Sequence, residues 1–239
     1  MRNQLRSGLD FLAGRGLNLA AVIDCAGLPE DVVGGMVAAG VPLAEYKRLL
    51  LLGHGGRRFW GALNAFGWQT ADPVDHFSIH LSQTFLRDYL DSPPYLRLYP
   101  LTDYLIPLQR LGELAGWCRP SPLGLGISPT YGLWFAYRAA FLVDADLPLT
   151  AFVPAISPCD TCADKPCITA CPPGAVRLVG GFDVFTCSHF RLEGNSPCHD
   201  RCLARLACPV APEHRYTLAQ VQYHYGRSLE TIRVYFGEE

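Results

Sequence analysis

The stretch CDTCADKPCITACP, residues 159–172, carries four cysteines in one tight run that ends in Cys-Pro. A second run, CSHFRLEGNSPCHDRCLARLACP at residues 187–209, also ends in Cys-Pro. Together they hold eight of the ten cysteines in this 239-residue chain. The bacterial run that binds [4Fe–4S] clusters is C-x2-C-x2-C-x3-C-P. The first run follows this pattern with two extra residues before its third cysteine, so the sequence predicts a pair of [4Fe–4S] clusters.

The Cys-Pro endings also predict which cysteines share a cluster. In the bacterial run the fourth cysteine ligates the other cluster, because the proline directs the chain away after it. We therefore expect each run to supply its last cysteine to the cluster of the other run. The first cluster is expected to bind Cys159, Cys162, Cys167 and Cys208, and the second Cys171, Cys187, Cys198 and Cys202.

Three other roles for these cysteines compete with iron–sulfur ligation. Disulfides require an oxidising compartment, and the N-terminus lacks the apolar core of a signal peptide. Two zinc sites remain an alternative, although four-cysteine zinc sites usually come as two C-x2-C pairs. Free thiols are the third alternative. Cys25 and Cys118 lie outside both runs and are expected to be buried thiols.

The composition limits the class of protein. Hydrophobic residues make up 49% of the chain and charged residues 18%, which is ample for a packed core. A formal net charge of −2 gives no strongly basic footprint, so nucleic acid is not an expected partner. No apolar run reaches the roughly 20 residues of a membrane span, so no membrane contact is expected. The many unpaired thiols indicate a reducing, cytoplasmic setting.

Residues 156–212 carry eight Cys and seven Pro but few large aliphatic residues, so metal would have to organise this part of the chain. Strands are expected at 17–24, 48–53, 95–99 and 133–143. Helices are expected from about residue 29 and at 73–89, 107–117 and 217–236. Such a mixture indicates an α+β, layered fold. The expected divisions are a domain at 1–152, a two-cluster ferredoxin-like module at 153–212 and a C-terminal helix at 213–239.

The stretch ISPTYGLWFAYR, residues 127–138, resembles the cobalamin-processing chaperones (decyanases and dealkylases). Those proteins carry Ile-His-Pro-x-Phe-Gly-x-Trp-Phe-Ala-x-Arg there, with His where this chain has Ser128. They are also similar to this chain at Asp72-Pro73-Val74-Asp75. Reductive dehalogenases share a shorter piece at 127–132. Epoxyqueuosine reductases share Gly-x-Trp-Phe at 132–135, followed by a two-cluster module in the same order.

The resemblance implies a nitroreductase-like domain that builds a cobalamin site. A corrin is a large apolar disc with polar edges, which suits aromatic faces and a few polar groups. The residues that the resemblance assigns to it are Pro129, Tyr131, Gly132, Trp134, Phe135 and Arg138. From the residues alone, Trp134 and Phe135 read better as core residues of a strand, and only the resemblance favours a corrin contact. The resemblance further implies a proton donor at Asp103 or Tyr104, although Asp103 also suits a turn or helix cap.

The predicted function is that of an iron–sulfur oxidoreductase. Electrons would come from an external donor, either a reductase or a flavodoxin or ferredoxin, and pass through two [4Fe–4S] clusters to a bound corrinoid. The corrinoid would be either the molecule processed or the cofactor that reduces a small substrate. The alternative is a non-catalytic, ferredoxin-type electron carrier or partner subunit. A zinc-stabilised binding module is the third hypothesis.

Overall fold

The computed structural model describes residues 2–67, 69–154 and 156–236. The chain forms two compact units that are interleaved in sequence. The sheet unit combines Met1–Trp117 with Phe135–Pro154, and the cysteine unit combines Cys118–Trp134 with Ala155–Glu239. The boundaries expected from the sequence are continuous, whereas here residues 118–134 and the C-terminal helix belong to the same unit as the cysteine runs.

The sheet unit is built on one four-stranded sheet whose neighbouring strands are all antiparallel. The strand order is β1 (Leu19–Asp24), β2 (Arg48–Gly55), β6 (Phe135–Val143) and β3 (Tyr95–Tyr99). The two central strands are continuous apolar runs, as expected for strands that are covered on both faces. Leu49, Leu50, Leu51 and Leu52 of β2 are all fully buried.

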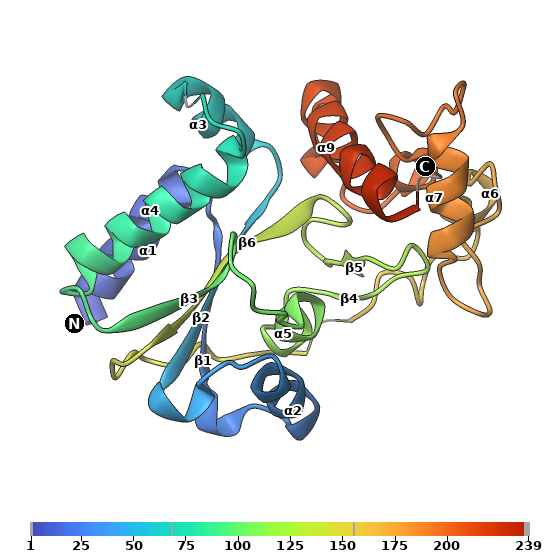
Figure 1. Ribbon diagram of the computed structural model, residues 1–239. Helices are drawn as coiled ribbons and strands as arrows, with labels where there is room; N and C mark the ends of the chain where they lie inside the picture. The colour runs from blue at the N-terminus through green and yellow to red at the C-terminus, as the bar shows by residue number, and fades with distance from the viewer. Residues whose placement is uncertain (1, 68, 155, 237–239) are drawn as a thin grey trace. The chain divides into compact units, whose positions relative to one another are not determined.

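Successive side chains of β2 pack on opposite faces of the sheet. Leu49 and Leu51 belong to a core that includes Val32 of α2 (Glu30–Ala38) and Leu111 of α5 (Leu108–Leu114). The opposite face is covered by α1 (Arg2–Gly14) and α4 (Pro73–Tyr89), which contact each other (Figure 1). Helix α3 (Arg58–Phe66) packs beside α4 on that face. Alternation along one strand thus produces a helix–sheet–helix arrangement.

Most of the elements predicted from the sequence are confirmed. All four strands of the sheet form, as do the helices expected near residue 29 and at 73–89, 107–117 and 217–236. Asp72 and Pro73 occupy the predicted N-cap and first helical positions of α4. Strand β2 is two residues longer than expected, so His54 is a fully buried strand residue. No described helix is long and apolar enough to cross a membrane.

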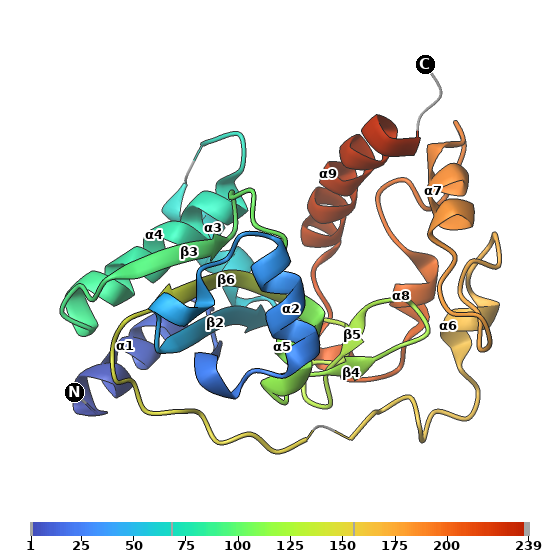
Figure 2. The same cartoon turned by 60° about the horizontal axis from the view of Figure 1, so that its bottom comes forward.

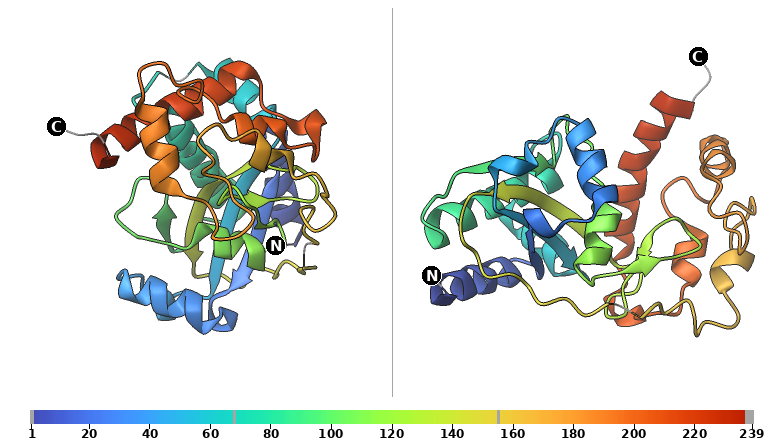
Figure 3. Two further views of the ribbon diagram at one scale, coloured as in Figure 1. Left: turned by 90° about the vertical axis from the view of Figure 1, so that its right-hand side faces the viewer. Right: turned by 90° about the horizontal axis from the view of Figure 1, so that it is seen from below.

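The cysteine unit has short elements and a small core. A hairpin of β4 (Arg119–Pro120) and β5 (Gly126–Ile127) lies next to α8 (Leu203–Ala207), which contacts α6 (Pro166–Thr169) (Figure 2). Helix α9 (Leu218–Phe236) runs beside α7 (Val184–Leu192) (Figure 3). The buried core beneath the hairpin is Leu123, Ile127, Leu133, Cys167, Val176, Ala204 and Cys208. Two of these seven residues are cysteines, so the cysteine-bearing segments form part of this core.

Candidate metal centre

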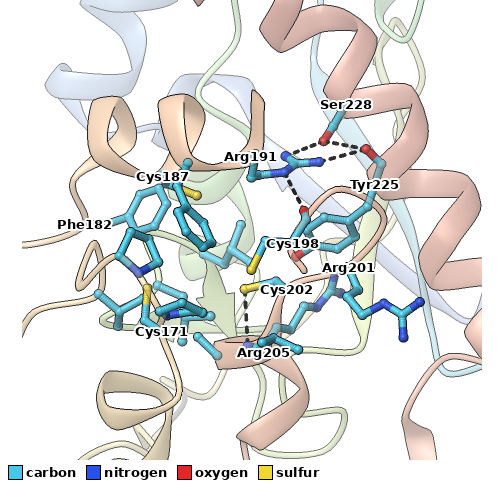
Figure 4. Close-up of a pocket in the computed structure, with 18 of the residues that line it drawn as sticks. Cys171, Phe182, Cys187, Arg191, Cys198, Arg201, Cys202, Arg205, Tyr225 and Ser228 are labelled. Atoms are coloured by element: carbon cyan, nitrogen blue, oxygen red, sulfur yellow. Dashed lines mark hydrogen bonds between the residues drawn. The ribbon is translucent and has the colours of Figure 1, made fainter. Parts of the chain in front are cut away.

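The eight cysteines of the two runs lie around two cavities within the cysteine unit. The small cavity is lined by Cys159, Cys162, Cys167 and Cys208. The large cavity, shown in Figure 4, is lined by Cys171, Cys187, Cys198 and Cys202. This grouping is the one that the Cys-Pro pattern predicts for the two clusters, including the exchange of the last cysteine of each run.

Two short helices divide the cysteines between the cavities. Cys167 lies within α6 and lines the small cavity, whereas Cys171, just past the end of α6, lines the large one. Cys202 and Cys208 lie at the two ends of α8 and serve the large and the small cavity respectively. The five residues of α8 span about 7.5 Å at 1.5 Å per residue. The two cavities are therefore joined through a single rigid turn of helix.

The cavities differ in size. The small cavity measures about 20 Å³ and the large one about 320 Å³. Among the described residues, no three His, Cys, Asp or Glu side chains are gathered tightly enough to hold one metal ion. Figure 4 shows the sulfurs of the large cavity spaced around its wall. A cubane in the small cavity would require its thiols to rotate outward, a change that involves a single χ angle in each cysteine.

Burial raises the pKa of several thiols in the two cavities, which favours their protonated form. Burial, together with the neighbouring Cys202, raises the pKa of Cys187 to about 11. Burial also raises the pKa of Cys167, with an added effect from Cys208 across the small cavity. Burial raises the pKa of Cys198 as well. Several thiolates facing one cavity repel one another, so a metal that binds here must displace protons.

Lys165 braces the loop of the first run. Its Nζ donates hydrogen bonds to the carbonyl oxygens of Cys159, at 3.0 Å, and Cys162, at 2.9 Å. Its backbone adopts a left-handed conformation, with φ of 39°. Lys165 lies in the longer interval between Cys162 and Cys167, where this chain has two more residues than the bacterial run. The insertion thus supplies both a turn and a cation that lines the small cavity.

Arg191 has the corresponding place at the large cavity. It follows Cys187 by four residues on α7, so the two side chains share one face of the helix. Arg191 is buried and binds the carbonyl oxygens of Cys198 (3.1 Å), His199 (3.2 Å) and Tyr225 (2.8 Å). It also donates to the hydroxyl of Ser228 at 2.9 Å. Figure 4 shows the bonds to Cys198, Tyr225 and Ser228, which join α7 to the second cysteine run and to α9.

Trp134 forms a second buried cluster in the cysteine unit. Its fully buried ring makes an edge contact with Tyr216 of the segment before α9. The guanidinium of Arg205 lies 4.7 Å from the centre of the same ring and binds the Leu133 carbonyl. The backbone N–H of Arg205 donates to Cys202 Sγ at 3.4 Å. Trp134 is therefore a packing residue whose neighbour Arg205 lines the large cavity.

The remaining corrin residues that the resemblance assigns are divided between the two units. Pro129 is exposed and Tyr131 is half-buried against His214 in the cysteine unit. The nearest neighbour of Gly132 is the Val210 carbonyl, which follows Cys208-Pro209. In the sheet unit, Phe135 is buried in β6, and buried Arg138 donates from Nε to His54 Nδ1 at 2.9 Å. None of the six assigned residues lines either cysteine cavity.

The two candidate proton donors lie in the segment between β3 and α5 of the sheet unit. Asp103 is exposed. Tyr104 is half-buried and packs against the core that contains α2 and α5. Their neighbour Thr102 donates its hydroxyl to the Leu98 carbonyl at 2.6 Å, which ties this segment to the end of β3. Of the two side chains, Asp103 is the one that is open to solvent.

Comparison with known proteins gives similarity in structure. No family model matches the sequence, and no curated protein matches it closely enough to count as a relative. The fold is similar to that of an epoxyqueuosine reductase solved with an epoxyqueuosine-modified tRNA-Tyr stem loop, with a TM-score of 0.59 and 13% identity. That match covers 92% of this chain and 68% of the other. The predicted resemblance to epoxyqueuosine reductases is confirmed at the level of the fold.

Two further solved structures match. A catabolic reductive dehalogenase, NpRdhA, has a TM-score of 0.52 and 10% identity, over 98% of this chain and 39% of that chain. A B12-trafficking protein of C. elegans, CblC, described as a homologue of human MMACHC, has a TM-score of 0.46 and 14% identity. The CblC match covers 98% of this chain and 97% of that chain. The matches to epoxyqueuosine reductase and to the reductive dehalogenase, at 13% and 10% identity, establish a shared fold.

Lys165 and Arg191 were not singled out from the sequence, although each left a signal there. Lys165 lies in the interval of the first run that is longer than the bacterial pattern. Arg191 lies four residues after Cys187, at helical spacing. The sequence analysis also missed the residues that cover the cavities: Leu123 and Ile127 come from the β4–β5 hairpin and Leu133 from the segment after it, all before the cysteine runs in the sequence. Only the tertiary structure brings that hairpin to the sulfurs.

Proposed function

We propose that this protein is an iron–sulfur oxidoreductase that holds two [4Fe–4S] clusters and passes electrons from an external donor to a bound corrinoid. The observation that supports the clusters is the sorting of eight cysteines into two cavities of four, with one cysteine of each run crossing to the other set. Two independent sites would not need this exchange. When bound, the clusters supply one-electron transfer steps.

The residues of this chain have separate roles in the proposed centre. The cysteines bind the clusters and release their protons as they do so. Leu123, Ile127 and Leu133 cover the sulfurs with apolar side chains and exclude water. Lys165 and Arg191 hold the ligand-bearing loops through backbone carbonyls. The short helix α8 keeps the two sites at a constant separation, which suits electron exchange between them.

The corrinoid part of the proposal is supported by the sequence resemblance at 127–138 and by the shared fold with epoxyqueuosine reductase. The assigned residues do not form a corrin pocket within either unit, because Trp134, Phe135 and Arg138 are buried by other contacts. Asp103 is the proposed proton donor, with Tyr104 as the second candidate, because its carboxylate is exposed.

Metal analysis tests the clusters directly. Protein purified without oxygen should be brown and contain about eight iron and eight acid-labile sulfide per chain, as two [4Fe–4S] clusters require. A colourless protein with two zinc ions would contradict the proposal and support the zinc-stabilised alternative. Zinc would also require the four sulfurs of each cavity to converge to about 2.3 Å from one ion.

A cobalamin titration tests the corrinoid. We expect the visible spectrum of added cobalamin to change on binding, and the bound cobalamin to be reduced when dithionite is supplied. A double variant, Cys159→Ser with Cys187→Ser, is the matched control: it should bind cobalamin but reduce it much more slowly. Clusters without any cobalamin binding would contradict the corrinoid proposal and favour a ferredoxin-type electron carrier.

A further inference from the structure

Arg191 is a buried cation whose bonding partners carry no charge. Its side chain is 6% exposed, and its four partners in the described part of the chain are three carbonyl oxygens and one hydroxyl. No carboxylate is among them. A buried charge without a counter-charge is strongly unfavourable, even when hydrogen bonds satisfy its donors. Arg191 is therefore a buried cation that an anion bound in the adjacent cavity would stabilise.

The large cavity is where such an anion would lie. Arg191 lines the large cavity together with Cys171, Cys187, Cys198 and Cys202 (Figure 4). A cubane bound by four thiolates is a net anion, and each electron that it accepts makes it more negative. A nearby cation thus stabilises the reduced cluster more than the oxidised one. Local charge and hydrogen bonding are among the factors that determine cluster reduction potentials.

The small cavity has a cation of the same kind in a weaker setting. Lys165 lines that cavity, and its Nζ is held by the Cys159 and Cys162 carbonyls, again without a carboxylate among its described partners. Its side chain is only partly buried. Solvent and salt screen an exposed charge more than a buried one. Lys165 should therefore act on its cluster less strongly than Arg191 acts on the other.

We propose that Lys165 and Arg191 are built-in counter-cations of the two clusters, and that buried Arg191 makes the cluster of the large cavity the more easily reduced of the pair. This inference rests on the proposed function, because it requires both clusters. It gives the electron path a direction within the cysteine unit: the first electron resides on the cluster held by Cys171, Cys187, Cys198 and Cys202.

The test is an anaerobic titration with dithionite, followed by electron paramagnetic resonance of the reconstituted protein. Ligand variants Cys159→Ser and Cys187→Ser assign each signal to its cluster. The signal altered by Cys187→Ser should appear first as the potential is lowered. In Arg191→Met, the ratio of reduced to oxidised form of that cluster should fall at least tenfold at a fixed potential, a shift of about 59 mV for one electron.

Two further variants separate charge from structure. Lys165→Met should lower the reduced fraction of the small-cavity cluster alone, by less than tenfold. Arg177→Met removes the same charge from a side chain that is 51% exposed and paired with Asp183 at 2.8 Å. Because Arg177 already has a carboxylate partner and is open to solvent, this control should leave both potentials unchanged.

Arg191→Lys keeps the charge and should keep the order of reduction. If Arg191→Met does not retain its cluster, Arg191→Lys becomes the deciding variant. The proposal is supported if the large-cavity cluster of Arg191→Lys is still reduced first. It is overturned if the small-cavity cluster is reduced first. The proposal would also be overturned if Arg191→Met and Arg177→Met shifted the reduction potential of the large-cavity cluster equally, or if neither shifted it. A protein without iron and sulfide would instead remove the proposed function itself, which the metal analysis reveals before any titration.

Discussion

Cys171 shows at the scale of one residue how the two sites are connected. It ends the first run in the sequence, yet its side chain lines the cavity formed mainly by the second run. The proline that follows it makes this crossing readable from the sequence. The roles of Lys165 and Arg191 could not be predicted from the sequence in the same way. Their importance depends on burial and on carbonyl partners that only the folded chain provides.

The crossing makes a prediction for Cys171→Ser. This variant should lose the same cluster as Cys198→Ser, with iron content falling by about half and the same paramagnetic signal disappearing. Cys118→Ala is the control, because Cys118 is buried outside both cavities and should leave the iron content unchanged. A Cys171→Ser protein whose spectrum matches that of Cys159→Ser would show that the cysteines are not exchanged between runs.

Cys25 makes a prediction about alkaline pH. Burial raises the pKa of this thiol from about 9 to about 11, with Asp24 adding to the rise and Arg48 opposing it. The unfolded chain loses this proton near pH 9, whereas the folded chain keeps it until about pH 11. The contribution to stability is therefore complete below pH 9 and is lost as the pH rises toward 11.

Thermal unfolding of the wild type and Cys25→Ala, measured from pH 8 to 11, checks this expectation. The wild type should lose more degrees of Tm between pH 9 and 11 than the variant does. The cluster cysteines are common to both proteins and cancel in the difference. Two curves that stay parallel across this range would contradict the assignment.

At the scale of the elements, strands β2 and β6 were predictable because each is a continuous apolar run. Helices α7 and α8 were not predicted, since cysteines and polar residues interrupt any apolar period there. Helix α7 instead begins with a local signal: the Asp183 carboxylate accepts a hydrogen bond from the Thr186 N–H at 2.9 Å. The sequence predicts that β2 ends at residue 53, whereas the strand continues to Gly55, and a shift in register falls between Leu52 and Gly53.

Gly132 makes a prediction for the turn before β6. Its φ is 57°, and a Cβ at this position would overlap the Val210 carbonyl. Gly132→Ala should therefore destabilise the cysteine unit by more than the roughly 1–2 kcal/mol of a left-handed residue alone. Chemical denaturation and iron retention of the reconstituted protein measure the effect.

Gly174→Ala is the matched control for this substitution. Gly174 lies in the same unit with φ of 67°, but nothing lies within 4 Å of the added Cβ. It should therefore lose only the conformational part of the free energy. Equal losses in the two variants would show that the contact with Val210 does not matter.

At the scale of the whole molecule, the two units rest on different kinds of core. The sheet unit buries long aliphatic and aromatic side chains on both faces of its sheet. The cysteine unit has a small core to which Cys167 and Cys208 contribute. The layered fold was predictable from hydrophobic patterns. The interleaving of the units was not, because residues 118–134 carry no marker of the unit to which they belong.

Metal removal should change the rate of hydrogen exchange in the cysteine unit but not in the sheet unit. After chelation, hydrogen exchange should stay slow in β2 and β6, whose burial needs no metal. Exchange should become fast in α6 and α8, where the proposed cluster would no longer hold the cysteine-bearing segments together. Hydrogen exchange followed by mass spectrometry of the two forms measures this. Hydrogen exchange that stayed slow throughout the chain after chelation, or became fast throughout it, would contradict this prediction.

The interleaved chain also has a consequence for biosynthesis. The β4–β5 hairpin is synthesised before any cysteine of the two runs, while its final packing partners extend to Cys208. At about 5–20 residues per second, the 74 residues between Trp134 and Cys208 take about 4–15 s to synthesise. During that interval Leu123 and Ile127 lack their burial partners, so nascent chains should depend on chaperones until iron can be inserted.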